Sequence, residues 1–459
     1  MKNEIDMLHG PLFMKIIMFT LPLAASSILQ QLFNSVDVAV VGRFASSQAL
    51  AAVGSNAPVI SLLINLFMGV SMGANVIISN HIGQNDRRSI RDAISTVGLV
   101  AIVSGLLMMV VGILVARPIL TMMDTPADVL DMAVTYLRIF FLGIPFFMIF
   151  DFGSAILRSM GDTRRPLYIL VAAGIVNTIL NLVFVIIFHM GVAGVAIATS
   201  IANAMSAALI IYLLLHEKEP YRLRPKKLYI EWKELKRMLQ IGVPAGLQGM
   251  VFSISNVLLQ ASINGYGSDA IAGSAAAVNF EYYCYFIIGA FNGAAISFTG
   301  QNYGARLNHR VKRIFAICLF MGFVGCAALN WFFIWQEDFF LRLFTDSPAV
   351  IAFGKTRMHI ALAWQSIAAF YEISGSVLRG MGKSMEPTLI TMFGTCLLRI
   401  VWIYTIMPGW RGFDHLITVY PVSWMITAVM MLGLYFWRTR KLLAQNARQA
   451  LMAKNVRKT

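Results

Sequence analysis

The chain has 459 residues, of which 58% are hydrophobic and only 13% charged, and its mean hydropathy is +0.71. This composition excludes the soluble globular classes and indicates a polytopic membrane protein. The net charge of +15 would suit a nucleic-acid-binding protein. The basic residues are distributed by loop, however, so membrane topology explains the charge and we expect no nucleic-acid partner.

Apolar stretches of about 20 residues, long enough to cross roughly 30 Å of hydrocarbon, recur along the whole chain. We predict an all-α fold with twelve transmembrane helices in the lipid bilayer. The first stretch is too long for a signal peptide and lacks a small-residue cleavage site, so we expect it to be retained. The predicted helices run over residues 15–41, 50–79, 94–116, 129–150, 167–188, 192–215, 238–263, 271–299, 314–335, 350–371, 388–408 and 416–437.

The lysines and arginines indicate the orientation of these helices. Of 37 basic residues, 29 lie at the two termini and in the connections that follow even-numbered helices. Six are counted on the opposite side: Arg43, Arg117, Arg342, Lys355, Arg357 and Arg411. The remaining two, Arg138 and Arg399, lie within predicted helices. The positive-inside rule therefore predicts that both termini are cytoplasmic.

The chain contains an internal repeat. The run "FGSAILRSMGDTRRP" (152–166) returns as "SGSVLRGMGKSMEP" (374–387), with Leu, Arg, Met, Gly and Pro identical at one constant offset. "GQN" occurs at 83–85 and again at 300–302. Pro22 and Asn34 recur as Pro244 and Asn256, and all three offsets agree within a few positions.

We expect two pseudo-symmetric six-helix lobes, residues 1–216 and 233–440, with a cytoplasmic linker at 217–232 and a basic tail at 441–459. Because each lobe has an even number of helices, the two enter the membrane from the same side. Paired bundles of this kind bind a substrate between them and open alternately to either side. This architecture favours a transporter.

Taken in order, "LPLAASSILQQLFNSVDVAVVGRF", "GQN", "ILRSMGDTRRP", "NTILN", "GVAGVAIATSIAN" and "SVLRGMGKSMEP" span nearly the full chain. The set resembles the multidrug and toxic compound extrusion (MATE) family of bacterial efflux antiporters. The resemblance implies a V-shaped pair of six-helix lobes that exports organic cations and amphiphilic drugs in exchange for H⁺ or Na⁺. We accordingly expect a small-molecule substrate, a monomer in the bacterial inner membrane, and no cofactor besides the coupling ion.

Asp37 is the acidic residue of the first helix and lies in its outer half. A carboxylate in lipid must carry a proton or be neutralised by a cation, so Asp37 is a candidate coupling residue. In the same helix we place Asn34 in the coupling site and Gln30 among substrate-binding residues. Pro22 removes a backbone hydrogen bond and is the candidate hinge.

Asn177 and Asn181 are four residues apart in the fifth helix and share one face, and Thr199 follows in the sixth. The resemblance maps the N-lobe cation site of the family onto Asp37 and these three residues, which offer oxygen ligands suited to Na⁺ or to a proton-linked network. Where many family members carry a second aspartate, this chain has Asn181, which weakens the case for Na⁺.

In the second half, Glu281 stands among aromatic residues in "NFEYYCYF", an arrangement that suits a lipophilic cation. We therefore predict substrate contacts at Glu281, Tyr282 and Asn256. Arg399 lies deep in an apolar segment and needs an anion, and Glu372 of the preceding helix is its expected partner in a structural ion pair. The roles of Asp151 and Arg138 stay open.

Three other functions fit the sequence less well. A flippase for a lipid-linked saccharide or peptidoglycan precursor is the alternative, but it would need several basic residues in the membrane to hold a pyrophosphate. A membrane enzyme would need a clustered catalytic set, which the scattered histidines and the four cysteines do not provide. A channel fits a tandem repeat less well than alternating access does. We therefore expect a transporter and no enzyme.

Overall fold

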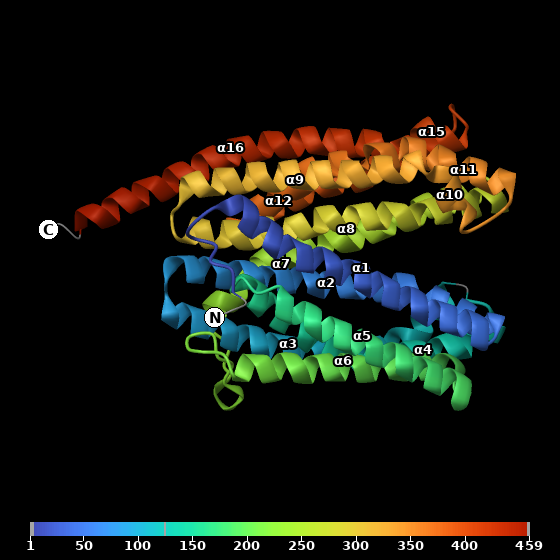
Figure 1. Ribbon diagram of the computed structural model, residues 1–459, viewed down its shortest axis with the longest axis horizontal. Helices are drawn as coiled ribbons and strands as arrows, with labels where there is room; N and C mark the ends of the chain where they lie inside the picture. Colours follow the sequence, from blue (N-terminus) through green and yellow to red (C-terminus); the bar gives the residue numbers. More distant parts are fainter. Residues whose placement is uncertain (1–3, 124, 457–459) are drawn as a thin grey trace. The chain divides into compact units, whose positions relative to one another are not determined.

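The computed structural model describes residues 4–123 and 125–456, and the described part is helical, without strands. Ten helical spans are long and apolar enough to cross a membrane. The helix α8 and the interrupted helix formed by α11, η3 and α12 complete the twelve predicted segments. The predicted all-α class is confirmed, and Figure 1 shows the order of the helices along the chain.

The first six segments are nearly continuous helices. The fifth ends in a π-helical turn, Val183–Ile187. Their bounds are α1 Leu12–Phe44, α2 Ser47–Gln84, α3 Arg87–Met122, α4 Ala127–Ser159, α5 Arg164–Leu182 and α6 Gly191–Leu215.

The second six are more often interrupted. Two π-helical turns, η4 (Met392–Leu397) and η5 (Trp402–Ile406), flank α14. Their bounds are α7 Trp232–Asn264, α8 Ser268–Gly304, α9 Asn308–Trp335, α10 Glu337–Arg342, α11 Pro348–Ile360, η3 Leu362–Ile367, α12 Ala368–Gly380, α13 Met385–Thr391, α14 Leu398–Val401, α15 Phe413–Ile417 and α16 Val419–Val456.

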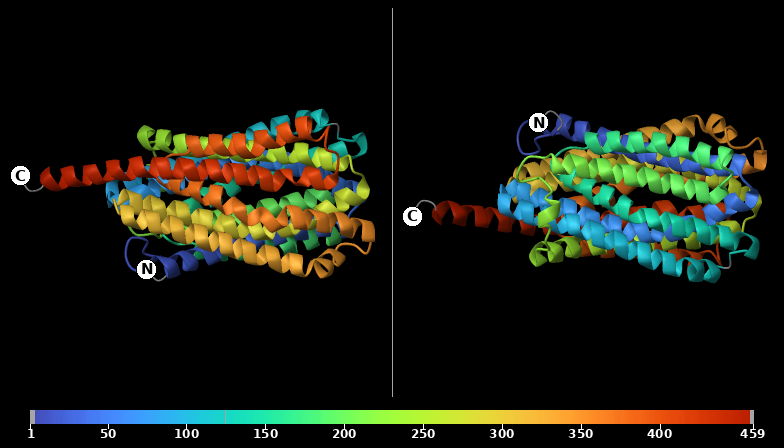
Figure 2. Two further views of the ribbon diagram at one scale, coloured as in Figure 1. Left: turned by 90° about the horizontal axis from the view of Figure 1, so that it is seen from above. Right: turned by 90° about the horizontal axis from the view of Figure 1, so that it is seen from below.

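The chain divides into two compact units, one of residues 1–6 and 25–246 and the other of residues 7–24 and 247–459. In the first unit α4 packs against α2, α3 and α6. In the second unit α8 packs against α9, α11 and α12, and α16 extends past the helices beside it (Figure 2).

This division differs from the predicted lobes at two helices. The first turns of α1, up to Ala24, belong to the second unit, and α7 up to Gly246 belongs to the first. Each of the two helices has 33 residues, so its halves can pack against different neighbours. Pro22 and Pro244 each stand two residues before the point at which the helix changes unit.

Glycines let α7 approach α2 closely within the first unit. A Cβ added at Gly69 would overlap the backbone nitrogen of Gly246, and one at Gly73 would overlap the carbonyl oxygen of Met238. Gly69 and Gly73 are four residues apart, as are Gly242 and Gly246, so each helix presents a small-residue face of the kind that packs tightly in lipid. Near one end of this contact, His81 and Glu234 form a buried pair at 2.8 Å.

The repeated "LR-MG" turn forms the same structure in both units. Gly161 and Gly382 have φ values of +96° and +82°, which favour glycine. In each turn the following N–H, of Asp162 or of Lys383, donates to the carbonyl five residues back, at 3.0 and 2.9 Å. Both helices therefore end with a Schellman-type cap.

The "GQN" echo, in contrast, is out of register by a helical turn. Asn85 has φ +57° and caps α2, whereas Asn302 lies inside α8, which continues to Gly304. The residue that takes the left-handed conformation after α8 is Arg306, with φ +60°. The repeated letters at 300–302 are therefore not at the equivalent place in the fold.

Candidate functional site

The first unit brings four predicted residues into one polar cluster. Asp37 comes from α1, Asn177 and Asn181 from α5, and Thr199 from α6. Nδ2 of Asn181 donates to Oδ1 of Asp37 and, at 3.1 Å, to Oδ1 of Asn177. Both asparagines are buried, with exposed fractions of 6% and 0%. The i, i+4 spacing in α5 places them on one face, as predicted.

The amide of Asn177 has two hydrogen-bonding arrangements. One end of the amide lies 2.8 Å from Oδ1 of Asp37 and 3.1 Å from Nδ2 of Asn181, and the other end lies 3.2 Å from the hydroxyl of Thr199. If the end near Asp37 is the amide oxygen, the carboxyl group must carry the proton of that contact. If it is the nitrogen, it donates to an ionised carboxylate and the amide oxygen accepts from Thr199, and the N–H of Asn181 then keeps its bond to Asp37 but loses the one to Asn177.

The cluster has one formal negative charge, that of Asp37. Across the described residues, no group of three or more His, Cys, Asp or Glu side chains gathers as a metal-binding cluster. The oxygens that could approach a cation here are those of Asp37, Asn177, Asn181 and Thr199. Asn181 already directs its N–H toward two of them.

Two other predicted residues of α1 stand apart from the cluster. Asn34 and Gln30 are exposed on α1, and within the described chain neither side chain forms a hydrogen bond with the cluster. Pro22 lies inside α1, where the sequence placed it.

The structure corrects the predicted role of Glu281. Its carboxylate is held by the guanidinium of Arg357, with Nε to Oε1 at 2.6 Å and Nη2 to Oε2 at 3.0 Å. Exposed fractions of 8% for Glu281 and 2% for Arg357 show that the pair is buried. Nη1 and Nη2 of Arg357 also donate to the hydroxyls of Ser274 and Tyr420. The charge of Glu281 is therefore already neutralised by Arg357, and Tyr282, the next residue, is half exposed.

Sequence reasoning missed Arg357 because it counted this residue with the outer connections. The helical run of α11 instead carries it into the interior, facing α8. The available signal was the position of Arg357 inside the predicted apolar segment 350–371. A cation there needs an acid, and Glu281 lies in the predicted segment 271–299.

The predicted ion pair of Glu372 and Arg399 is also wrong. Glu372 lies on α12 and accepts from the hydroxyl of Tyr285 at 2.9 Å and from Nδ2 of Asn292 at 3.1 Å, both on α8. The register of α12 turns this carboxylate toward α8, whereas Arg399 on α14 faces α7 and α16.

Arg399 is fully buried and has neutral partners. It donates to Oδ1 of Asn256 at 2.9 Å and lies over the rings of Phe252 and Tyr420, with 5.2 and 4.6 Å from the guanidinium carbon to the ring centroids. Its Nε lies 3.5 Å from the hydroxyl of Ser423. Asn256, predicted to contact substrate, is therefore a hydrogen-bond acceptor for this cation.

The residues whose roles were open lie in simpler settings. Asp151 lies 3.6 Å from Arg158 on the same helix, a pair that belongs to the repeated turn region. Arg138 is exposed on α4. The four cysteines are buried and free.

One family model, MatE, matches the chain twice, at residues 22–183 and 244–405. The two matches begin at the repeated prolines, Pro22 and Pro244, and span segments of equal length, which confirms the internal repeat. Together they cover more than half of the chain.

Curated relatives match along most of their length. The probable multidrug resistance protein YpnP of Bacillus subtilis is 25% identical over 89% of this chain and 91% of its own. The probable multidrug resistance protein NorM of Thermotoga maritima is 27% identical over 84% of each chain.

Solved structures share the fold. A MATE transporter in a bent conformation has a TM-score of 0.88 at 20% identity, over 94% of this chain and 96% of that one. An outward-facing multidrug resistance MATE transporter of the MOP superfamily has a TM-score of 0.89 at 21% identity, over 95% and 98%.

Proposed function

The chain belongs to the MatE family of multi-pass membrane transporters, which are not enzymes, and we propose that it exports amphiphilic organic compounds, including cationic drugs, in exchange for protons. Support for the substrate class comes from relatives described as multidrug resistance or export proteins, among them MepA of Staphylococcus aureus, 20% identical over 88% of this chain. The transporter works by alternating access between its two repeats.

The proposal of proton coupling rests on the contact between Asp37 and Asn177. A protonated Asp37 donates to the amide oxygen of Asn177, which then turns its N–H toward Thr199. Loss of the proton reverses the amide, so that its N–H donates to the carboxylate. One proton therefore changes the bonding between α1, α5 and α6.

Na⁺ is the second candidate ion, and two features disfavour it. The cluster has one carboxylate, and the N–H of Asn181 already points at that carboxylate, where a cation would need oxygen ligands. A site of this kind can hold a proton without any further ligand. We therefore assign no metal and no cofactor.

In this proposal α1 transmits the change in bonding at Asp37 toward Pro22. Residues 25–44 of this helix belong to the first unit, with Asp37, and residues 12–24 belong to the second unit, with Pro22. A bend at Pro22 changes the orientation of one part of the helix relative to the other, because the proline ring leaves a backbone carbonyl without its usual donor. Pro22 is thus the proposed hinge between coupling and transport.

We propose that the protein is a monomer in a bacterial plasma membrane. Both termini are in the cytoplasm in this proposal, as the distribution of basic residues indicates. The alternative of a lipid-precursor flippase is not favoured. A pyrophosphate would need several accessible, unpaired cations within the membrane. Arg357 is already neutralised by Glu281, and Arg399 is fully buried against Asn256 and two aromatic rings.

The test is substrate efflux from proteoliposomes driven by a pH gradient alone and, separately, by a Na⁺ gradient alone. Asp37→Asn should abolish efflux driven by the pH gradient. The matched acid-to-amide control is Asp131→Asn, an exposed residue of the same unit that pairs with Arg117 at 3.2 Å, and it should leave efflux unchanged. Efflux by Asp37→Asn at the wild-type rate contradicts the coupling site, and efflux that needs Na⁺ and ignores pH contradicts the proton.

A further inference from the structure

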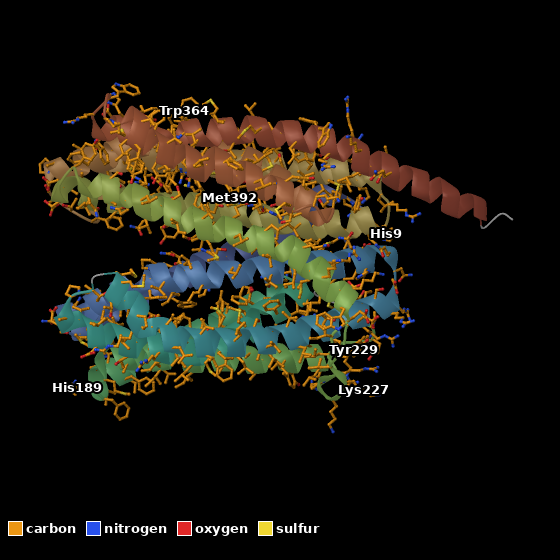
Figure 3. All side chains as sticks on the ribbon, turned by 180° about the vertical axis from the view of Figure 1, so that it is seen from behind. His9, His189, Lys227, Tyr229, Trp364 and Met392 are labelled. Carbon is orange, nitrogen blue, oxygen red and sulfur yellow. The ribbon has the colours of Figure 1, made fainter. Side chains whose placement is uncertain are left out.

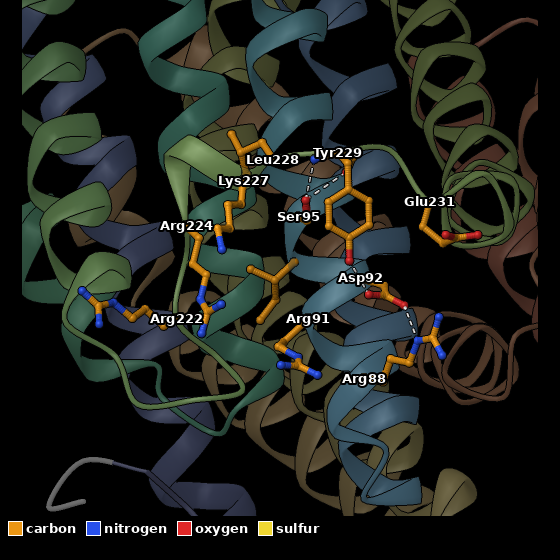
Figure 4. Close-up of a pocket in the computed structure, with 11 residues that line it drawn as sticks. Arg88, Arg91, Asp92, Ser95, Arg222, Arg224, Lys227, Leu228, Tyr229 and Glu231 are labelled. Atoms are coloured by element: carbon orange, nitrogen blue, oxygen red, sulfur yellow. Dashed lines mark hydrogen bonds and ion pairs between the residues drawn. The ribbon is translucent and has the colours of Figure 1, made fainter.

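We propose that the first unit carries, at its predicted cytoplasmic end, a binding site for a phosphate-bearing anion, for which the head group of an anionic phospholipid is the source. The site is a pocket of about 470 Å³ between α3 and the connection from α6 to α7 (Figure 4). Five basic side chains line it: Arg88, Arg91, Arg222, Arg224 and Lys227.

The connection is held on α3 by specific bonds, so the pocket is part of the fold. The hydroxyl of Ser95 donates to the carbonyl of Tyr229 at 2.9 Å and accepts from its N–H at 2.7 Å. The N–H of Glu231 donates to the hydroxyl of Thr96 at 2.9 Å. The hydroxyl of Tyr229 donates to Asp92. These bonds fix residues 229–231, and the basic run 222–227 lies just before them in the chain.

The pocket has an excess of positive charge, because its five basic side chains face two lining carboxylates, those of Asp92 and Glu231. Arg88 lies 3.9 Å from Asp92, but its side chain is 87% exposed, so this pair is weak. Arg224 pairs with Glu219 at 2.5 Å. In the described part of the chain, no ion pair is formed by Arg91, Arg222 or Lys227.

Arg91, Arg222 and Lys227 come from both walls of the pocket. Figure 4 shows Arg222, Arg224 and Lys227 on the connection and Arg88 and Arg91 on α3. Guanidinium groups match the geometry of a phosphate, which can accept from several at once. A site with three unpaired cations facing one pocket suits a group that carries one or two negative charges.

The level of the pocket favours a lipid head group over a free phosphate. Ile94 lines the pocket and marks the start of the apolar run of α3. Tyr229 and Trp232 are 46% and 74% exposed beside it, and such aromatic side chains are typical of the membrane–water interface. Figure 3 shows Lys227 and Tyr229 at the end of the first unit opposite His189. Basic clusters beside a membrane segment on the cytoplasmic side attract anionic lipids.

The experiment compares binding of phosphatidylglycerol and of inorganic phosphate by the purified full-length protein. Lipid retention is measured in vesicles of phosphatidylcholine with and without phosphatidylglycerol, and thermal stabilisation is measured with each probe. The variant is Arg91→Gln/Arg222→Gln/Lys227→Gln. The matched control, Lys312→Gln/Arg313→Gln/Arg440→Gln, removes three exposed charges from the second unit.

We expect phosphatidylglycerol to bind the wild type and the control alike. The pocket variant should bind it at least about tenfold more weakly, since each basic residue near a membrane surface contributes substantially to the attraction. Binding of inorganic phosphate that the pocket variant loses equally supports the anion site, with a soluble source. Equal weakening in both triple variants means general surface charge and overturns the proposal. Failure of the wild type to bind either probe also overturns it.

Discussion

At matching positions of the two repeats, the first unit carries Asp37 and Asn177 where the second carries Leu259 and Arg399. The scaffold is shared, but the charge is inverted. In the first unit the carboxylate of Asp37 lies among neutral amides and a hydroxyl. In the second, a permanently charged guanidinium is held by Asn256, the counterpart of Asn34.

The difference teaches that a duplicated scaffold can carry a titratable group at a position in one copy and a permanent charge or an apolar residue at the matching positions of the other. A carboxylic acid can gain or lose a proton under cellular conditions, whereas an arginine stays charged. The second unit also buries the ion pair of Glu281 and Arg357. Removing one partner of such a buried pair is strongly destabilising, because the other charge is left in the interior without a counterion.

The largest effect is expected from breaking that ion pair. Arg357→Gln leaves the carboxylate of Glu281 buried without a counterion and should cost about 3–5 kcal/mol of stability, seen as a lower Tm in detergent. The control is Lys355→Gln on the same helix, whose partially exposed pairs with Asp338 at 2.9 Å and Glu337 at 3.2 Å should matter by less than about 1 kcal/mol. If the two variants melt at the same temperature, the buried pair does not stabilise the second unit more than the exposed pairs do.

The close contact of α2 and α7 gives the next largest effect. Gly69→Ala places a methyl group against the backbone of Gly246, which forces the helices apart at a cost of about 1–3 kcal/mol. Gly289→Ala on α8 meets nothing within 4 Å and should be neutral or slightly stabilising. Measured by thermal unfolding of both variants, an equal response would show that the glycine contact of the first unit has no special role.

The matched asparagines test the charge inversion directly. Asn256→Ala removes a hydrogen bond from the buried charge of Arg399 and should cost about 1.5–3 kcal/mol. Asn34→Ala changes an exposed side chain and should stay within about 0.5 kcal/mol. Chemical or thermal unfolding of both variants gives the comparison, and a reversed order would mean that the two repeats use this position alike.

The smallest effect concerns the helices that follow α2 and α8. Asp86 caps α3 by accepting from the N–H groups of Arg88 and Ser89, whereas α9 begins after Leu307, which has no capping side chain. Asp86→Ala should therefore cost about 1 kcal/mol, and Asp86→Asn much less, because asparagine also caps.

The same cap predicts a pH dependence. Bonds from the hydroxyl and the N–H of Ser89 lower the pKa of Asp86 below its usual range near 4. Its stabilising contribution is thus present above that range and is lost as the pH falls through the lowered pKa. Tm measured across this interval should fall slightly more for the wild type than for Asp86→Asn. A parallel fall in both proteins would contradict the assignment.

Much of the fold could be predicted from the sequence because lipid imposes strict rules. Long apolar runs can span lipid only as helices, and the repeated Pro22 and the "LR-MG" turn mark the duplication without any tertiary information. The spacing of Asn177 and Asn181 placed them on one face of a helix, and their approach to Asp37 followed from the family resemblance. The predicted helices, the turn and the shared face depend only on residues that are close together in the chain.

The partners of the buried charges could not be predicted in the same way. Sequence order favoured Glu372 as the partner of Arg399 and left Glu281 free, but the rotation of each helix about its own axis decides which neighbour a side chain meets. A 3₁₀ turn interrupts the tenth segment, and two π-helical turns interrupt the eleventh. These turns change the rotation of the helix about its axis, and the hydrophobic periodicity of the sequence does not reveal them.

The sequence alone therefore determined the membrane class, the number of helices, the duplication and the acid in one repeat only. Tertiary structure decided which helix halves join which unit, which arginine neutralises Glu281, and how a connection folds onto α3 to form a basic pocket. The physical reason is that hydrophobic length and turn chemistry act along the chain, whereas ion pairs and glycine contacts depend on the register between helices distant in sequence.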